Sequence, residues 1–153
     1  MDFIGIDYGS KYIGLSWGSG DLGVVVPLEP ICNISSWEEA CKSLDKVVKE
    51  KGCDAFVLGL PLHMDGTEGI RVQEVRRFAK KLEAHFKKPI FFQDERLSTQ
   101  ATQYLSGNQA QSLHKAKKQK ARGIVDSQSA MIILQDFLEC TQDIRNAILK
   151  DFL

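Results

Sequence analysis

The sequence predicts an α/β domain built on a mixed five-stranded sheet, with an antiparallel meander followed by parallel strands and with helices on both faces. Three observations favour this architecture. Short apolar segments come first, strand-like and helix-like segments alternate afterwards, and glycines and prolines separate them. With 153 residues and 43% apolar content, the chain has the size and composition of one domain with a single core.

The first three strands are expected at residues 3–7, 12–17 and 23–28. Each segment is short and rich in apolar and β-branched residues, and glycine-bearing turns separate them. Short turns join strands that pair antiparallel. The N-terminal part of the chain should therefore form a meander.

A first helix should follow, because Ser36 and Glu39 have the spacing of a capping box. Apolar residues then recur at helical spacing until Gly52, namely Trp37, Ala40, Cys41, Leu44, Val47 and Val48. Residues 55–60 are continuously apolar and stop at Pro61, as expected for a parallel strand buried on both faces. This strand should be central.

The second half of the chain continues the alternation. Residues 75–86 have helical spacing, and Pro89 introduces a fifth strand at 90–92. A short helix should begin at Ser98 or Thr99. A polar, lysine-rich stretch at 106–123 precedes a last helix at 125–138, which residues 143–152 extend.

Composition limits the classes of protein to consider. The N-terminus lacks a basic secretory leader and no apolar run reaches the roughly 18 residues that cross a bilayer, so we expect a cytoplasmic protein without membrane contact. The four cysteines show no disulfide or zinc-ligand spacing, and we interpret them as reduced packing residues.

The formal net charge is zero, which argues against a protein that coats nucleic acid through bulk positive potential. Charge is nevertheless concentrated locally, and a second basic group runs from Arg71 to Lys88. A segment without acidic residues carries five cations that could contact phosphates: Lys115, Lys117, Lys118, Lys120 and Arg122. The alternative interpretation is a solvated loop.

Three separated carboxylates are the strongest candidates for chemistry. Asp7 follows the first strand, and Glu95 follows the fifth, so both should reach the carboxyl edge of the sheet. Asp126 lies four residues before Ala130 and seven before Ile133, on the core-facing stripe of the last helix. A carboxylate on that stripe is costly unless it is paired or binds a metal.

Each carboxylate also has a structural explanation: a turn residue at Asp7, a surface ion pair between Glu95 and Arg96, and a helix cap at Asp126. Together, three converging carboxylates favour one or two Mg²⁺ or Mn²⁺ ions. Zinc is disfavoured, because His63, His85 and His114 have no companion ligand at suitable spacing. Two divalent cations suit in-line displacement at a phosphodiester.

Four segments resemble the YqgF/RuvX family: GIDYGSK at 5–11, GLPLHMDGTEG at 59–69, DERLST at 94–99 and VDSQSA at 125–130. Members are described as Holliday-junction-resolvase-like proteins and as candidate nucleases of the 16S ribosomal RNA precursor. The resemblance implies a single ribonuclease H-like domain over residues 1–153, with its core at about 3–139 and a helical extension at 140–153. It also implies Asp7, Glu95 and Asp126 as the acidic triad.

The same motifs supply candidate substrate contacts at Lys11, Asp65, Gly66, Thr67 and Arg96. The loop that carries Asp65, Gly66 and Thr67 precedes a helix, so its backbone N–H groups either meet a phosphate or cap that helix.

The sequence therefore predicts a metal-dependent nuclease whose substrate is nucleic acid, with structured RNA favoured and a role in 16S ribosomal RNA maturation. The first alternative is a Holliday junction resolvase, which needs two active sites and hence a dimer; the sequence does not give the oligomeric state. A second is a non-catalytic nucleic-acid-binding module. A third is an actin-like or sugar-kinase-like nucleotide binder, for which the chain is short.

Overall fold

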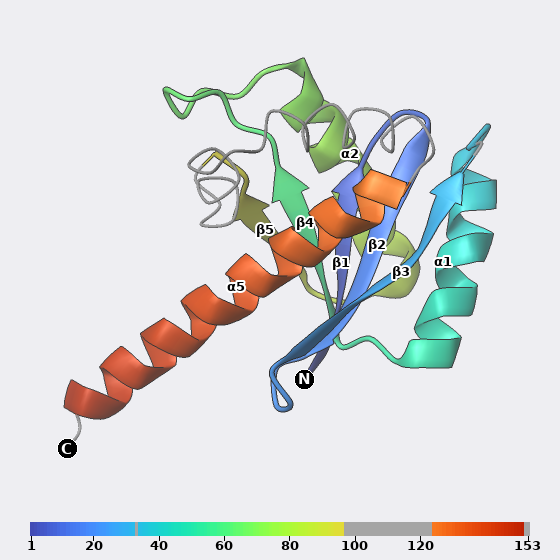
Figure 1. Ribbon diagram of the computed structural model, residues 1–153. Coiled ribbons are helices and arrows are strands. Elements are labelled where there is room, and N and C mark those ends of the chain that lie inside the picture. Colours follow the sequence, from blue (N-terminus) through green and yellow to red (C-terminus); the bar gives the residue numbers. More distant parts are fainter. Residues whose placement is uncertain (33, 97–123, 152–153) are drawn as a thin grey trace, which may run out of the picture.

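Five strands form one sheet in the order β3-β2-β1-β4-β5 (Figure 1). The computed structural model describes residues 1–32, 34–96 and 124–151, although the side chains of some residues in the last helix, Asp126 among them, lie outside that description. The strands are β1 (Asp2–Tyr8), β2 (Tyr12–Ser19), β3 (Val24–Cys32), β4 (Ala55–Leu60) and β5 (Ile90–Asp94).

The sheet is mixed, as the sequence predicts. Strand β1 pairs antiparallel with β2, and β2 pairs antiparallel with β3, which makes the meander. On its other side β1 pairs parallel with β4, and β4 pairs parallel with β5. Every residue of β4 is buried, which explains its continuous apolar sequence.

Strand β3 runs four residues past the segment expected from sequence and includes Pro27 and Pro30. Both prolines are tolerated because β3 is an edge strand, where one side of the backbone needs no partner. The register between β2 and β3 also shifts between Ile13 and Leu15, so Pro30 falls in an irregular part of the ladder.

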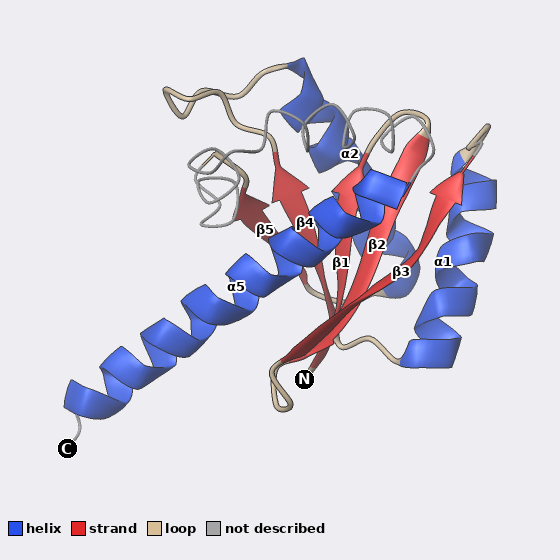
Figure 2. Cartoon of the chain, in the orientation of Figure 1, coloured by secondary structure: helices blue, strands red, loops and turns tan. Residues whose placement is uncertain are grey.

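Helices α1 (Trp37–Lys51) and α2 (Ile70–Phe86) cover one face of the sheet (Figure 2). Their apolar stripes meet the even-numbered residues of β1 and β4, which alternate toward that face. This main core contains Ile4, Ile6, Phe56, Leu58, Ala40, Leu44, Val72, Val75, Phe78 and Leu82 among its buried residues.

The first turn of α1 shows a variant of the expected capping box. Ser36 Oγ accepts a hydrogen bond from the Glu39 backbone N–H at 3.3 Å, as predicted. The Glu39 carboxylate, however, accepts from the backbone N–H and the hydroxyl of Ser35 instead of returning to Ser36. These bonds lower the pKa of Glu39. The helix ends at Gly52, whose positive φ of 80° favours glycine.

Helix α5 (Ile124–Asp151) crosses the opposite face, so helices cover both faces as predicted. Its expected extension beyond residue 138 is a direct continuation of the same helix. The backbone of α5 comes close to β1 at Gly5, where an added Cβ would lie 2.9 Å from the Ala130 carbonyl oxygen. Beside it, the buried Ser16 hydroxyl donates to that carbonyl at 2.7 Å. A glycine and a serine therefore allow the backbone of α5 to lie close to the sheet.

Two further predictions concern residues that the structure does not describe. The short helix expected from Ser98 or Thr99, together with the polar stretch at 106–123, falls outside the described ranges. Across the described ranges, no helix combines the length and apolar character needed to cross a membrane.

Candidate active site

The carboxyl ends of β1, β4 and β5 meet at one edge of the sheet, since the three strands are parallel. Asp7 is the penultimate residue of β1, Asp94 is the last residue of β5, and Glu95 follows it. The strands that deliver Asp7 and Glu95 are not direct neighbours, because β4 lies between them. Their carboxylates must therefore approach each other across β4.

Gly59 makes this approach possible. Residue 59 lies on β4, and Asp7, Gly5 and Phe3 alternate toward the face of the sheet that α5 covers. A Cβ atom added at Gly59 would lie 2.2 Å from Glu95 Oε1, so the Glu95 side chain occupies the space that any other residue would fill. The Glu95 backbone N–H donates to the Leu60 carbonyl at 3.2 Å and anchors the turn.

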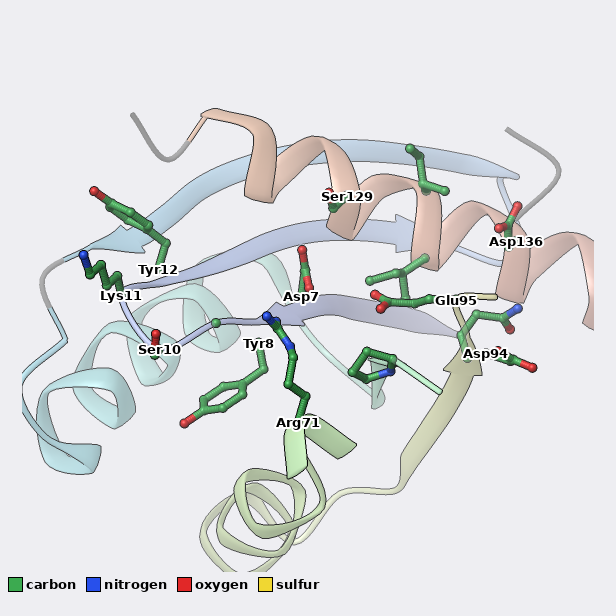
Figure 3. A pocket seen from close by; sticks show the side chains of 15 residues that line it. Asp7, Tyr8, Ser10, Lys11, Tyr12, Arg71, Asp94, Glu95, Ser129 and Asp136 are labelled. Carbon is green, nitrogen blue, oxygen red and sulfur yellow. The ribbon is translucent and has the colours of Figure 1, made fainter. Parts of the chain in front are cut away.

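Both carboxylates line a cavity of about 560 Å³. Figure 3 shows Asp7 and Glu95 in the space between the strand ends and α5, with Arg71 extending toward it from the start of α2. The lining residues are Asp7, Tyr8, Gly9, Ser10, Lys11, Tyr12, Pro61, Arg71, Gln93, Asp94, Glu95, Ser129, Ile132, Ile133 and Asp136.

Helix α5 contributes one side of the cavity through Ser129, Ile132, Ile133 and Asp136. Asp126 belongs to the same helix, three residues before Ser129, which is the spacing of neighbours on one helical face. Its side chain lies outside the described residues, so the helix position supports its predicted role and the contacts of its carboxylate stay a prediction.

The structure adds Asp136, which the sequence reasoning missed. This carboxylate is 7% exposed and lines the cavity. Burial raises its pKa, and the charge of Glu139 adds to the increase. Its signal in the sequence is a polar residue seven positions after Ser129 and three after Ile133, within a stripe that otherwise packs against the sheet.

Two cations face the acidic edge. Lys11, predicted from the first motif, lines the cavity from the turn after β1. Arg71, one residue into α2, lines it from the opposite side, although the sequence showed it only as the start of a basic group. Both side chains are exposed, so each can reach an anionic ligand that enters from solvent.

Arg96 is held by Asp94 within the third motif. Its Nε donates to Asp94 Oδ2 at 2.9 Å, Nη2 lies 2.8 Å from the same oxygen, and its backbone N–H donates to Oδ1 at 2.9 Å. These bonds lower the pKa of Asp94, so this carboxylate stays ionised beside Glu95. The guanidinium therefore supports the acidic turn, and its predicted contact with the substrate stays a prediction.

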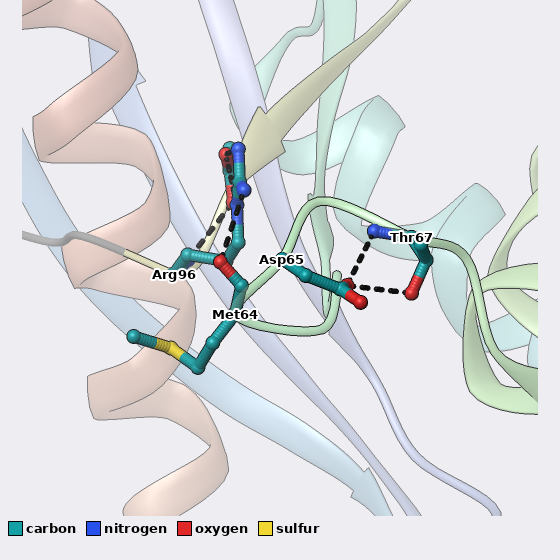
Figure 4. A network of polar contacts seen from close by, with 5 residues as sticks. Met64, Asp65, Thr67 and Arg96 are labelled. Atoms are coloured by element: carbon teal, nitrogen blue, oxygen red, sulfur yellow. Dashed lines mark hydrogen bonds and ion pairs between the residues drawn. The ribbon is translucent and has the colours of Figure 1, made fainter.

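Asp65, Gly66 and Thr67 form a self-contained turn outside the cavity lining (Figure 4). The Thr67 backbone N–H and hydroxyl donate to Asp65 Oδ1 at 2.9 and 2.6 Å, which lowers the pKa of Asp65. Gly66 has a φ of 87° and packs against Arg96. Helix α2 begins after Gly69 without a side-chain cap, so Asp65 closes its own turn rather than capping the helix.

The cations of the basic segment lie outside the described residues, so their predicted contacts stay predictions. They are Lys115, Lys117, Lys118, Lys120 and Arg122.

The donor set suits a hard cation. Among the described residues that line the cavity, the possible side-chain ligands are carboxylate, amide and hydroxyl oxygens, with no cysteine or histidine among them. Oxygen-only sites prefer Mg²⁺ or Mn²⁺ to zinc. Asp7 and Glu95 therefore fit the predicted ions as ligands, with Asp126 placed on the adjoining helix.

Comparison with known proteins extends this description from the site to the whole chain. A family model described as "RuvX: Holliday junction resolvase" matches residues 1–140. The chain belongs to the RuvX family. The match includes all four motifs that the sequence singled out, and it ends within α5.

Relatives of this RuvX-family chain include one from Lactobacillus acidophilus named "Putative pre-16S rRNA nuclease", 36% identical over 91% of this chain and 96% of its own length. A relative of the same name from Methylocella silvestris is 37% identical over 89% of this chain and 81% of its own. The structure titled "T. thermophilus RuvC in complex with Holliday junction substrate" has a TM-score of 0.53 at 15% identity, covering 93% of this chain and 96% of that one. This likeness confirms the ribonuclease H-like fold.

Proposed function

We propose that this RuvX-family chain is a divalent-metal-dependent nuclease that hydrolyses phosphodiester bonds in nucleic acid. The observation that carries the proposal is the convergence of Asp7 and Glu95 on one cavity, across the space that Gly59 leaves open. A glycine that makes room for a carboxylate is hard to explain if that carboxylate serves only a surface ion pair.

The residues around the cavity divide the work of such a reaction. Lys11 and Arg71 attract the phosphate backbone and set its position, since cations provide most of the affinity for nucleic acid. Asp7, Glu95 and Asp126 hold one or two Mg²⁺ or Mn²⁺ ions. When bound, these ions supply Lewis-acid stabilisation of charge and a water of lowered pKa.

Glu95 is positioned by its surroundings. Its backbone N–H is bonded to β4, its side chain and that of Ile133 of α5 both lie beside Gly59, and the ionised Asp94 next to it is paired with Arg96. This arrangement orients one ligand before the cation arrives, which lowers the entropic cost of assembling the site.

The proposed substrate is structured RNA, and the proposed role is maturation of the 16S ribosomal RNA precursor. The names of the relatives from Lactobacillus acidophilus and Methylocella silvestris support this choice. The description of the family supports a DNA four-way junction as the second candidate. A resolvase cuts two symmetric strands and therefore acts as a dimer, so the oligomeric state separates the candidates.

The test is a cleavage assay on a 16S precursor fragment, a single-stranded RNA and a DNA four-way junction, each with Mg²⁺, Mn²⁺ or a chelator. Asp7→Asn and Glu95→Gln should lower cleavage about 100-fold or more, a typical cost of removing one group that stabilises transition-state charge. Asp143→Asn and Glu74→Gln are matched controls, because both positions are exposed and outside the cavity lining.

Chelator-sensitive cleavage of the precursor RNA, lost in both site variants and kept in both controls, supports the proposal. Preferred cleavage of the DNA four-way junction by a dimeric protein would instead support the resolvase alternative. Binding without cleavage under every metal condition, unaffected by Asp7→Asn, would identify a non-catalytic binding module.

The basic segment has a separate proposed role in affinity, because it carries five cations and no group suited to activating water. Neutralising four lysines together should reduce the slope of log affinity against log salt by up to about one for each lost phosphate contact. An unchanged slope would contradict this role. The substituted residues are Lys115, Lys117, Lys118 and Lys120.

A further inference from the structure

A second group of potential ligands lies in the layer formed by α1 and α2, on the other face of the sheet from α5. Cys41 and Asp45 are four residues apart on α1, so they occupy one face of that helix. His85 stands in the last turn of α2 and faces them. The Cys41 side chain is buried, while the side chains of His85 and Asp45 are 41% and 40% exposed.

One ligand atom from each of these residues lies within 4.8 Å of the other two. His85 Nε2 is 3.1 Å from Asp45 Oδ1, and Cys41 Sγ is 4.0 Å from Asp45 Oδ2. A tetrahedral zinc ion with bonds of about 2.0 to 2.3 Å would separate such atoms by roughly 3.3 to 3.6 Å. The ligand atoms therefore need to come closer by up to about 1.2 Å, which rotation of half-exposed Asp45 and His85 can provide.

We propose that Cys41, Asp45 and His85 form a zinc-binding site that fastens α1 to α2. One thiolate, one imidazole and one carboxylate are a borderline-soft set, which favours zinc over the Mg²⁺ or Mn²⁺ that suits the oxygen-lined cavity. Zinc binding deprotonates the Cys41 thiol and releases one proton to solvent. The thiolate and the Asp45 carboxylate then balance the two positive charges of the ion.

The surroundings of Cys41 agree with a thiol that stays unreactive until a metal ion binds. Burial is the main cause of the raised pKa of Cys41, and the charges of Asp45 and Glu38 add to it. That increase keeps the thiol protonated and inert when no cation is near. Glu38, three residues before Cys41 on α1, stands where a fourth ligand can come from, with water as the alternative.

A simpler explanation is an ion pair in which Asp45 and protonated His85 join the two helices. That pair is about 40% exposed on both sides, so it would contribute little to stability. The Cys41 thiol donates a weak hydrogen bond to Asp45 Oδ2 at 4.0 Å, and this contact places a third potential ligand beside the pair. The presence of a buried cysteine at the third corner is what distinguishes a metal site from an ion pair.

The experiment uses the full chain, stripped of metal with a chelator, and titrates Zn²⁺ or Co²⁺ alone. Calorimetry gives the affinity and number of sites, and near-ultraviolet absorption of the Co²⁺ form reports a bond to thiolate. Titrations are carried out in the Glu95→Gln background as well, so that binding at the cavity is separated from binding between α1 and α2. Cys140→Ser is the matched control, since Cys140 is an exposed cysteine on α5.

We expect one zinc site whose affinity falls about 100-fold or more in both Cys41→Ser and His85→Gln, because removing a direct ligand costs at least as much as removing its supporting partner. Cys140→Ser and Glu95→Gln should keep the affinity, the thiolate absorption band and a zinc-induced rise in melting temperature. His85→Gln changes an exposed position, so its result stands even if Cys41→Ser disturbs folding.

Zinc affinity that is unchanged by His85→Gln, or a Co²⁺ form without thiolate absorption, would overturn the site. The outcome is independent of the proposed nuclease activity, because the three residues lie outside the cavity lining and the readouts are binding, absorption and melting.

Discussion

Substitution of Gly59 by alanine is the sharpest test of how the cavity is built. Gly59 is the penultimate residue of the buried strand β4, and it is far along the chain from the predicted ligands Asp7, Glu95 and Asp126. An added Cβ would lie 2.2 Å from Glu95 Oε1 and 2.5 Å from Ile133 Cδ1. Ordinary contact begins near 3.4 Å, so the carboxylate must retreat by about 1.2 Å.

A displacement of about 1 Å in a reacting arrangement can cost roughly 100-fold in rate, and we expect Gly59→Ala to lower metal-dependent cleavage by about that factor. The overpacking should also lower the free energy of unfolding by about 1 to 3 kcal/mol, less than the roughly 5 to 15 kcal/mol of a typical domain, so the variant should stay folded. Single-turnover cleavage of the RNA precursor fragment measures the first effect, and urea denaturation without metal measures the second.

Gly20→Ala is the matched control, because its Cβ would meet its nearest neighbour, Phe3, at an ordinary 3.4 Å. It should cleave like the parent. A double-mutant cycle with Glu95→Gln tests whether Gly59→Ala acts through Glu95. Once the carboxylate is gone, Gly59→Ala should not weaken metal binding further. Parental cleavage by a folded Gly59→Ala variant would refute the crossing of Glu95 over β4 as the basis of the site.

Three further predictions follow from single positions. Asp126→Asn should abolish or strongly reduce cleavage while melting without metal stays level or rises, because asparagine caps a helix as well as aspartate does; parental turnover would exclude a ligand role. Burial raises the pKa of Asp136, so the folded protein holds this proton more tightly than the unfolded chain, and stability falls as the pH rises above about 3.8. Asparagine carries no charge to bury, so Asp136→Asn should be more stable than the parent at pH 7. Urea denaturation should show this gain shrinking toward zero below pH 3.8. Burial raises the pKa of Cys53 to about 11, so iodoacetamide at pH 8 should label the exposed Cys32 and Cys140 long before Cys53 in the native protein, as peptide mapping would show.

Much of the fold follows from local patterns in the sequence. Alternating and continuous apolar segments predicted all five strands, and the spacing at Ser36 and Glu39 predicted the start of α1. The predicted end of β3 was wrong, because the strand continues past residue 28 through Pro30, which the edge of this sheet accommodates. Edge position depends on strand order, which no local pattern contains.

The candidate site divides in the same way. Strand ends predicted that Asp7 and Glu95 would share one edge of the sheet, and the structure brings them to one cavity. Strand β4 lies between β1 and β5, and this order explains why residue 59 is a glycine. Strand order depends on how the chain connects the strands, so it could not be predicted from residue spacing.

Contacts between distant segments account for what the sequence reasoning missed. Cys41 and His85 are 44 residues apart, so the absence of zinc-ligand spacing did not reveal that α1 and α2 bring them together. Asp136 escaped notice for a related reason, since it reaches the cavity only when α5 crosses the sheet at the observed angle.

The close approach of α5 at Gly5 and Ser16 affects the position of the whole helix. Helix α5 also packs on the sheet through Ile133 and Leu134, but its backbone comes close to β1 at Gly5, so a larger side chain there would shift the helix along much of its length. Substitutions on the outer surface of α5 should therefore be tolerated, whereas a larger residue at position 5 or 16 would displace Asp126 and Asp136 together. Neither position lines the cavity, yet both affect where α5 places the residues that line it.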